Sequence, residues 1–130
     1  MSTILAPTSF GELIDKITIL EIKRVRIAEP EKRRNVENEL AALCRIRDAA
    51  VHEDDTVRTL TEELLHINEA LWDIEDAIRR CESAVDFGAD FVSLARSVYK
   101  QNDRRSAVKR RINEALGSDL IEEKSYAPYE

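Results

Sequence analysis

Apolar residues recur along most of this chain at intervals of three and four positions, the spacing that places side chains on one face of an α-helix. The clearest run extends from Val57 to Cys81 without a missing step. A run of this length is typical of a helix that packs along a coiled-coil-like seam against a neighbour. We therefore predict a helix over residues 55–83. Its seam consists of Val57, Leu60, Leu64, Ile67, Leu71, Ile74, Ile78 and Cys81.

Three more helices are predicted over residues 9–28, 30–51 and 87–116, and their ends carry local signals. Ser9, with Glu12 three positions later, forms a capping box in which each side chain bonds the backbone N–H of the other residue. Pro30 suits the first position of the second helix, and Gly117 suits the C-terminal cap of the last one. Residues 118–130 follow as an acidic, partly extended tail.

These elements predict an all-α fold, an elongated antiparallel four-helix bundle with coiled-coil-like packing. The 130 residues include only three glycines and three prolines, a composition that favours helices, and the length suits one domain over residues 1–130. Leu65 and Trp72 lie seven positions apart on the third helix, away from its seam. A second apolar strip needs a cover of its own, so we predict a homodimer.

The fourth predicted helix contains a polar interruption. Gln101 and Arg105 occupy positions where the stripe demands apolar residues, and Asn102 with Asp103 can cap a new helix start. Either the helix breaks there or a polar layer crosses the bundle. Arg24 raises the same question in the first helix, because a buried arginine must meet an acid, solvent or a ligand. Two inward arginines would resemble small helical mutases of the chorismate type, whose internal site is lined with arginines.

Charge is distributed in blocks along a chain whose net charge is -6. Residues 53–82 sum to -7 and residues 96–111 sum to +6, so the two blocks are expected either to pair or to act separately. The basic block is a candidate site for a phosphate, carboxylate or sugar phosphate. Nucleic acid is not expected, because the chain is acidic overall and lacks a basic and aromatic binding motif. The anion-binding candidates are Arg96, Tyr99, Lys100, Asn102, Asp103, Arg104 and Arg105.

Carboxylates form a second group of candidates, at Asp15, Asp73 and Asp76. Facing pairs of acids three or four residues apart can hold magnesium, and in outline the pattern resembles the all-α nucleotide pyrophosphohydrolases. Asp76, however, falls opposite the seam, which favours a solvated acidic face. We therefore predict no metal and no cofactor. Two histidines and two separated cysteines also argue against a zinc site, a disulfide or a Ser/His/Asp triad.

The longest uncharged apolar stretch is short, so no membrane span is expected. The first ten residues, MSTILAPTSF, lack the basic start and apolar segment of a secretory signal. These features predict a cytoplasmic protein.

Four segments of the chain stand out as motifs: SFGELIDKITILEIK (9–23), LWDIEDAIR (71–79), LARSVYKQND (94–103) and EEKSY (122–126). Together they resemble a family of small bacterial proteins of unknown function, and the resemblance covers most of the chain. It implies a link to surface-polysaccharide metabolism, without a known activity. It also implies that shared motifs contain Asp15, Trp72, Asp73, Asp76, Arg96, Tyr99, Asn102 and Asp103.

Two functions follow from these patterns. The leading hypothesis is a non-enzymatic interaction or assembly module, with itself or another protein as partner, because the seam is unbroken and no nucleophile constellation is present. The alternative is a small helical enzyme or binding protein for an anionic, phosphorylated or nucleotide-linked substrate, based on the basic residues around the polar interruption.

Overall fold

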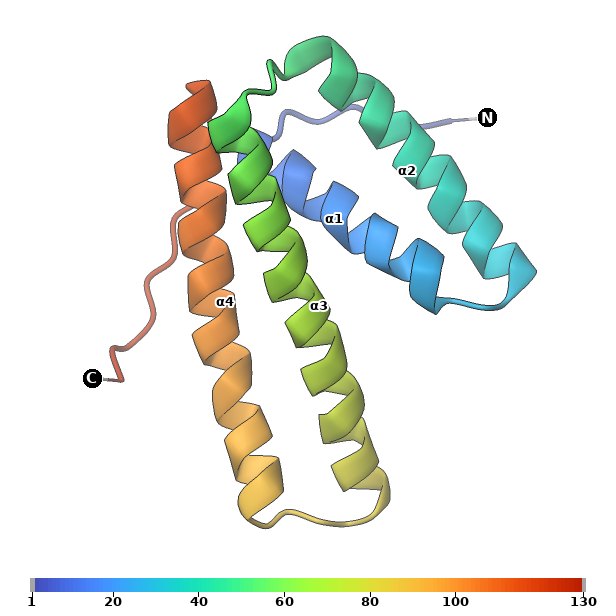
Figure 1. Cartoon of the computed structure of the whole chain (residues 1–130), viewed down its shortest axis with the longest axis vertical. Coiled ribbons are helices and arrows are strands. Elements are labelled where there is room, and N and C mark those ends of the chain that lie inside the picture. The colour runs from blue at the N-terminus through green and yellow to red at the C-terminus, as the bar shows by residue number, and fades with distance from the viewer. Residues whose placement is uncertain (1, 130) are drawn as a thin grey trace.

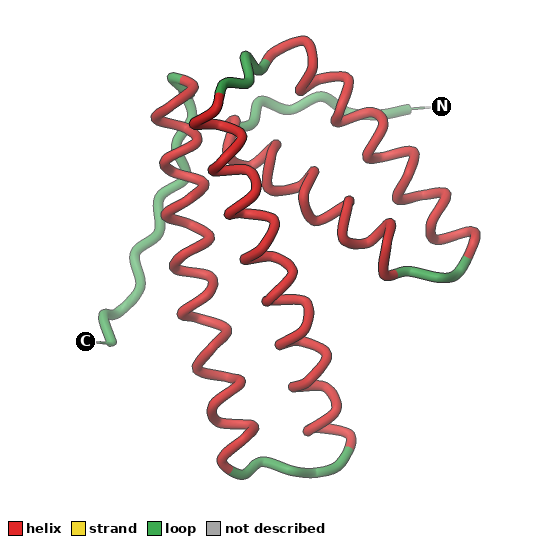
Figure 2. The backbone as a smooth tube through the Cα atoms, in the orientation of Figure 1, coloured by secondary structure: helices red, strands yellow, loops and turns green. Residues whose placement is uncertain are grey.

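The computed structural model describes residues 2–129, which form four α-helices and no strand. The predicted all-α fold with four helices is thereby confirmed (Figures 1 and 2). The helices are α1 (Phe10–Arg26), α2 (Pro30–Ala50), α3 (Asp55–Ser83) and α4 (Ala89–Leu116).

The helices form two hairpins of unequal length. α3 and α4 make a long antiparallel hairpin, and the shorter α1–α2 pair leans against one half of it (Figure 1). α1 packs against all three other helices, whereas α2 packs against α1 alone among the described helices. α1 therefore lies at the centre of the bundle.

The core has two parts, one on each side of α1. Leu13, Ile17 and Leu20 pack against Val36 and Leu40 of α2. On its other side, α1 contributes to a second cluster that joins α3 and α4 and contains Ile14, Val57, Leu60, Leu64, Ile67, Val108 and Ile112. The apolar residues on several sides of α1 are thus explained by burial between neighbours.

The helix ends follow the local signals in the sequence. The Ser9 hydroxyl accepts a hydrogen bond of 3.1 Å from the Glu12 backbone N–H, as half of the predicted capping box. The carboxylate of Glu12 instead accepts a bond from Lys109 on α4. Asp54 caps α3 in the same way as Ser9 caps α1, and Gly117 ends α4 at a φ of 66°.

Gly11 allows α1 to approach α4 very closely. Its backbone N–H donates a 2.7 Å hydrogen bond to the side-chain oxygen of Asn113. A Cβ atom at position 11 would lie 2.5 Å from the backbone oxygen of Lys109. The contact between the two helices therefore requires a residue without a side chain.

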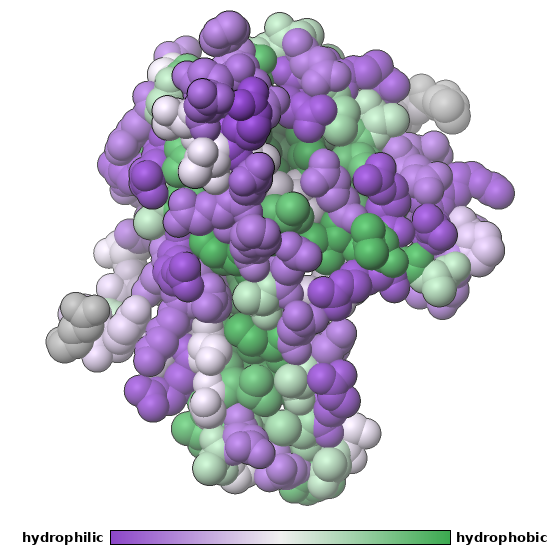
Figure 3. Space-filling model, viewed as in Figure 1, coloured by the Kyte–Doolittle hydropathy of each residue, from purple (hydrophilic) through white to green (hydrophobic). Residues whose placement is uncertain are grey.

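The far end of the α3–α4 hairpin extends beyond α1, which reaches only the beginning of it, where Arg26 donates a hydrogen bond to Asp73. We call residues 71–95 the distal hairpin; none of them is buried, although the seam of α3 continues through them. Val85, Phe87 and Val92 are exposed there, and apolar residues reach the surface of this part of the molecule (Figure 3). The cause is length: at 1.5 Å per residue, α1 spans about 26 Å and α3 about 44 Å.

None of the helices described is both long and apolar enough to cross a lipid bilayer. Cys44 and Cys81 are both free thiols, and each is half-buried.

Candidate functional site

A polar layer crosses the bundle where the sequence of α4 is interrupted. α4 is continuous through Asn102 and Asp103, so the interruption does not break the helix. Arg105 instead extends to α1 and forms an ion pair with the fully buried carboxylate of Asp15. Its Nε donates to Oδ1 at 2.9 Å and its Nη2 donates to Oδ2 at 2.5 Å. This paired geometry is the strongest form of arginine–carboxylate contact.

Two further buried side chains complete the hydrogen bonds of Asp15. The Asn68 amide of α3 donates to Asp15 Oδ1 and to the Thr18 hydroxyl, both at 2.9 Å. The Thr18 hydroxyl donates in turn to the backbone oxygen of Asp15 at 2.8 Å. Three helices thus meet at one carboxylate, and its polar atoms are satisfied as burial requires.

The surroundings favour the charged form of Arg105. The hydrogen bonds with Asp15 raise the pKa of Arg105 above its ordinary value, against the opposing effect of burial. About a quarter of the Arg105 side chain stays exposed, and its Nη1 lies 3.5 Å from the Asn102 side-chain oxygen. The guanidinium is therefore largely occupied by protein partners.

A second charged cluster lies one helical turn further along α4. The buried Lys109 ammonium donates to Glu12 at 2.7 Å and to Glu122 at 3.3 Å. Burial lowers the pKa of Lys109, but the hydrogen bond to Glu12 and the nearby carboxylates outweigh burial and raise it. The hydrogen bond from Lys109 lowers the pKa of Glu122. Lys109 therefore fixes the C-terminal tail as well as α1.

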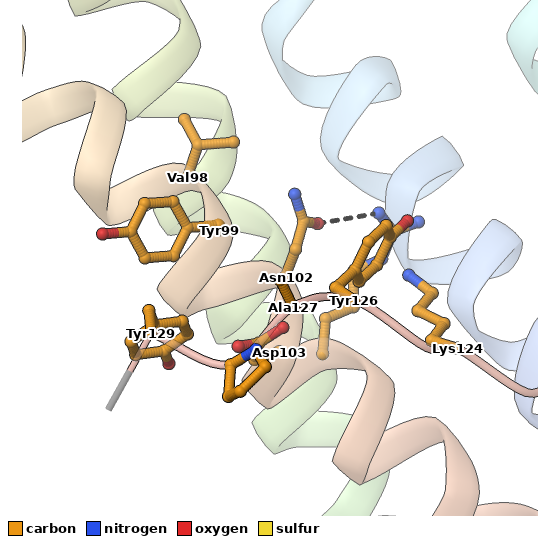
Figure 4. A pocket seen from close by; sticks show the side chains of 10 residues that line it. Val98, Tyr99, Asn102, Asp103, Lys124, Tyr126, Ala127 and Tyr129 are labelled. Carbon is orange, nitrogen blue, oxygen red and sulfur yellow. Dashed lines mark hydrogen bonds between the residues drawn. The ribbon is translucent and has the colours of Figure 1, made fainter.

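The docked tail encloses a groove against α4. Glu123 bonds Arg110 at 3.1 Å, and the rings of Tyr99 and Tyr129 meet at a centroid distance of 4.9 Å. Between these attachments lies a groove of about 970 Å³, at the upper end of the range for small-molecule sites (Figure 4). Its walls are Val98, Tyr99, Asn102, Asp103, Arg105, Lys124, Tyr126, Ala127, Pro128 and Tyr129.

A smaller cleft of about 450 Å³ lies on the other side of Arg105, between α1 and α3. Trp72 lines it together with Ile19 and Ile22, so α1 faces one side of this tryptophan. Asp76 lines the same cleft. The second apolar strip that includes Trp72 is therefore partly covered within one chain.

The structure brings together four of the seven anion-binding candidates. Tyr99, Asn102, Asp103 and Arg105 line the groove. The other three, Arg96, Lys100 and Arg104, are exposed and are not among the residues that line it. Only one of the predicted basic side chains thus faces the groove.

The expected pairing of the basic block with the acidic face of α3 is almost absent. Arg111 and Glu63, at 3.8 Å, form the one ion pair between α3 and α4 within residues 2–129. Arg105, Lys109 and Arg110 instead pair with acids outside α3, and Arg96, Lys100 and Arg104 form no ion pair within the described residues.

Arg24 corrects one of the sequence predictions, because it is exposed rather than buried. It lies in the last turn of α1, where three successive residues, 24–26, are exposed beside the turn into α2. Arg24 therefore reaches solvent and does not share a cavity with Arg105.

The three carboxylate candidates lie in different surroundings. Asp15 is buried against Arg105, whereas Asp73 is exposed and accepts a 2.8 Å hydrogen bond from Arg26. Asp76 is exposed at the edge of the smaller cleft. Within residues 2–129, no group of three or more histidine, cysteine, aspartate or glutamate side chains is arranged to hold a metal ion.

Sequence reasoning missed several residues of the site. Thr18 and Asn68 are polar but carry no motif that marks them as buried. Lys109 appears in the sequence as one basic residue among several, and only its place one turn after Arg105 links it to the polar layer. Lys124 belongs to the tail, and no periodic pattern predicts where the tail lies.

A family model matches residues 6–129, nearly the whole chain, and it describes a family of unknown function, DUF6165. The chain belongs to this family. The resemblance found in the four sequence segments is thereby confirmed at the level of the family. No curated protein and no solved structure matches the chain. The function of this DUF6165 member must therefore be argued from its own geometry.

Proposed function

We propose that this chain is a non-enzymatic interaction module that associates with a second copy of itself through the distal hairpin. The observation that carries the proposal is the half-covered seam within residues 71–95, where no residue is fully buried. Apolar side chains repeat there at the spacing of a helix-packing face, but two helices alone cannot enclose them. A second hairpin packed against the first would complete a four-helix arrangement.

The shape of the distal hairpin supports a helical partner. A hollow of about 460 Å³ lies between α3 and α4 near the turn. Small or apolar side chains line it together with three charged ones: Ala77, Arg80, Cys81, Ala84, Asp86, Asp90, Ser93 and Leu94. Side chains from a facing helix would fill it, and burial of each Leu- or Ile-sized group contributes about 1.5–3 kcal/mol.

The distribution of charge supports a second copy in particular. Arg96, Lys100 and Arg104 on α4 form no ion pair with another residue between 2 and 129, and neither do Glu69 and Asp76 on α3. In a two-fold arrangement, α3 of one copy lies beside α4 of the other, so unpaired acidic and basic side chains of the two copies approach each other at the rim of the interface. Charge pairs at a rim fix orientation more than affinity.

Sedimentation velocity on two variants tests this proposal. Val92 is exposed in the distal hairpin, so Val92→Glu leaves the monomer intact but places a charge in the proposed interface. We expect the wild type to sediment as a dimer and Val92→Glu as a monomer. Val25→Glu is the matched control, because Val25 is exposed at the end of α1, outside the distal hairpin.

A wild-type chain that stays monomeric at micromolar and higher concentrations contradicts the proposal. So does a Val92→Glu variant that stays as dimeric as Val25→Glu. Circular dichroism of all three proteins establishes that each retains its helices. The link to surface-polysaccharide metabolism that the resemblance implies stays a prediction.

A further inference from the structure

All three tyrosines of the chain line the groove between α4 and the tail. Tyr99 comes from α4, and Tyr126 and Tyr129 come from the tail. Figure 4 shows Tyr99 and Tyr129 toward one end of the groove and Tyr126 on the opposite side, with the carboxylate of Asp103 between the two tail tyrosines. Aromatic rings and a carboxylate therefore face the same space.

The cations that line this groove already have carboxylate partners. Arg105 is held by Asp15, and Lys124 lies 3.8 Å from Glu122. Asp103, in contrast, is exposed and forms no ion pair with any residue from 2 to 129. The charge that the groove leaves unmatched is negative.

We infer that this groove binds a small organic cation, a ligand that carries an alkylated ammonium group. Rings of tyrosine attract such a group through their negative faces, and a neighbouring carboxylate supplies the counter-charge. Apolar surface from Val98, Ala127 and Pro128 suits the alkyl substituents. This site is distinct from the apolar surface proposed for self-association, because its charged and aromatic groups lie outside the distal hairpin.

The same arrangement disfavours the anionic ligand expected from the sequence. The fully buried carboxylate of Asp15 already neutralises Arg105 through Nε and Nη2, so a phosphate would meet a guanidinium whose charge is compensated. It would also approach the unpaired Asp103. Three of the basic candidates lie outside the groove and would not offset these costs.

Titration of the isotope-labelled full chain, followed by amide NMR at constant ionic strength, tests the inference with three probes. The first is choline. The second is its uncharged carbon isostere, in which a tert-butyl group replaces trimethylammonium. The third is inorganic phosphate. We expect choline to shift amides within 98–105 and 124–129 and the isostere to bind about tenfold more weakly, a factor that corresponds to about 1.4 kcal/mol.

Two variants identify the residues responsible. Asp103→Asn keeps the shape of the side chain and removes its charge, and should weaken choline binding about tenfold. Asp119→Asn makes the same change at an exposed position that is not part of the groove, and should leave binding unchanged. Both positions are exposed, so neither change disturbs packing.

Four results overturn the inference: equal affinity for choline and the isostere, undiminished binding by Asp103→Asn, groove shifts with phosphate alone, or no groove shift with any probe. Phosphate-only shifts would instead support the anion-binding alternative. These outcomes are distinct from loss of the dimer, because the sedimentation experiment does not depend on the groove.

Discussion

Arg105 of α4 and Asp15 of α1 form a two-hydrogen-bond ion pair across 90 positions of sequence, at 2.9 and 2.5 Å. Asp15 is fully buried, and Arg105 keeps about a quarter of its side chain exposed. Because each charge was removed from water on folding, the pair stabilises the fold only as long as both partners are present. The ion pair connects α1 to α4 near the point along the hairpin where α1 no longer covers the seam of α3.

Removal of either Asp15 or Arg105 should therefore lower the stability of the fold. We expect Asp15→Ala to lower the free energy of unfolding by about 3–5 kcal/mol, since it leaves the guanidinium without its partner in a largely buried position. Arg105→Ala should cost a similar amount because it leaves the carboxylate with Asn68 alone. The double variant Asp15→Ala/Arg105→Ala should lose clearly less stability than the sum of the two single effects.

Urea denaturation of the four proteins measures these differences, with Arg104→Ala as the control. Arg104 is exposed and adjacent in sequence, so its change should stay below about 0.5 kcal/mol. Strictly additive effects of the two replacements would show that the side chains do not act as a pair.

The close contact at Gly11 predicts a second effect on stability, and this one is purely steric. An added methyl group would lie 2.5 Å from the backbone oxygen of Lys109, which cannot move without shifting α4. Gly11→Ala should therefore cost about 1–3 kcal/mol, as overpacking does. Thermal unfolding of Gly88→Ala provides the comparison, because a Cβ there meets only the Asp86 side chain at 3.3 Å. Equal losses of stability in Gly11→Ala and Gly88→Ala would refute the steric explanation.

Periodicity and local signals were enough to predict the helices. Leu64 and Ile112 lie in stripes that the sequence marks plainly, and both are completely buried. Ser9 and Gly117 act as caps because capping depends on residues within one turn, which the sequence contains in full. Features that depend only on residues close together in the sequence, such as stripes and caps, could therefore be predicted.

Features that depend on the relative placement of the helices could not be predicted from the sequence. The seam of α3 is equally apolar from Val57 to Cys81, yet only its first half is buried, because α1 ends before it reaches the rest. Arg24 and Arg105 both interrupt apolar stripes, but only Arg105 lies opposite a buried acid. Their difference is set by tertiary contacts rather than by any local pattern.

The attachment of the tail should depend on pH through Glu122. Its pKa is lowered in the folded protein by the hydrogen bond from Lys109. The carboxylate thus stabilises the docked tail above its unfolded pKa of about 4.3, and this contribution disappears as the pH falls through the lower folded value. We expect the NMR signals of the Tyr129 ring to move toward unstructured positions in that acidic range.

Glu122→Gln separates this effect from general acid unfolding. The variant lacks the titrating charge, so its tail should be loosened already at neutral pH and should change less on acidification. If its Tyr129 signals follow the same acid transition as the wild type, the ion pair with Lys109 does not hold the tail.

Hydrogen exchange should divide α3 into two parts. Amides near Leu60 and Leu64 lie over the buried core and exchange only through large openings, whereas those near Ile78 lie over the half-covered distal hairpin and open locally. If a second copy covers that end, protection near Ile78 must rise with protein concentration while protection near Leu64 stays constant. Exchange measured by mass spectrometry at two concentrations, with Val92→Glu as a monomeric reference, tests this directly. Concentration-independent exchange at Ile78 would mean that the distal seam remains open to water and that its partner is not another copy of this chain.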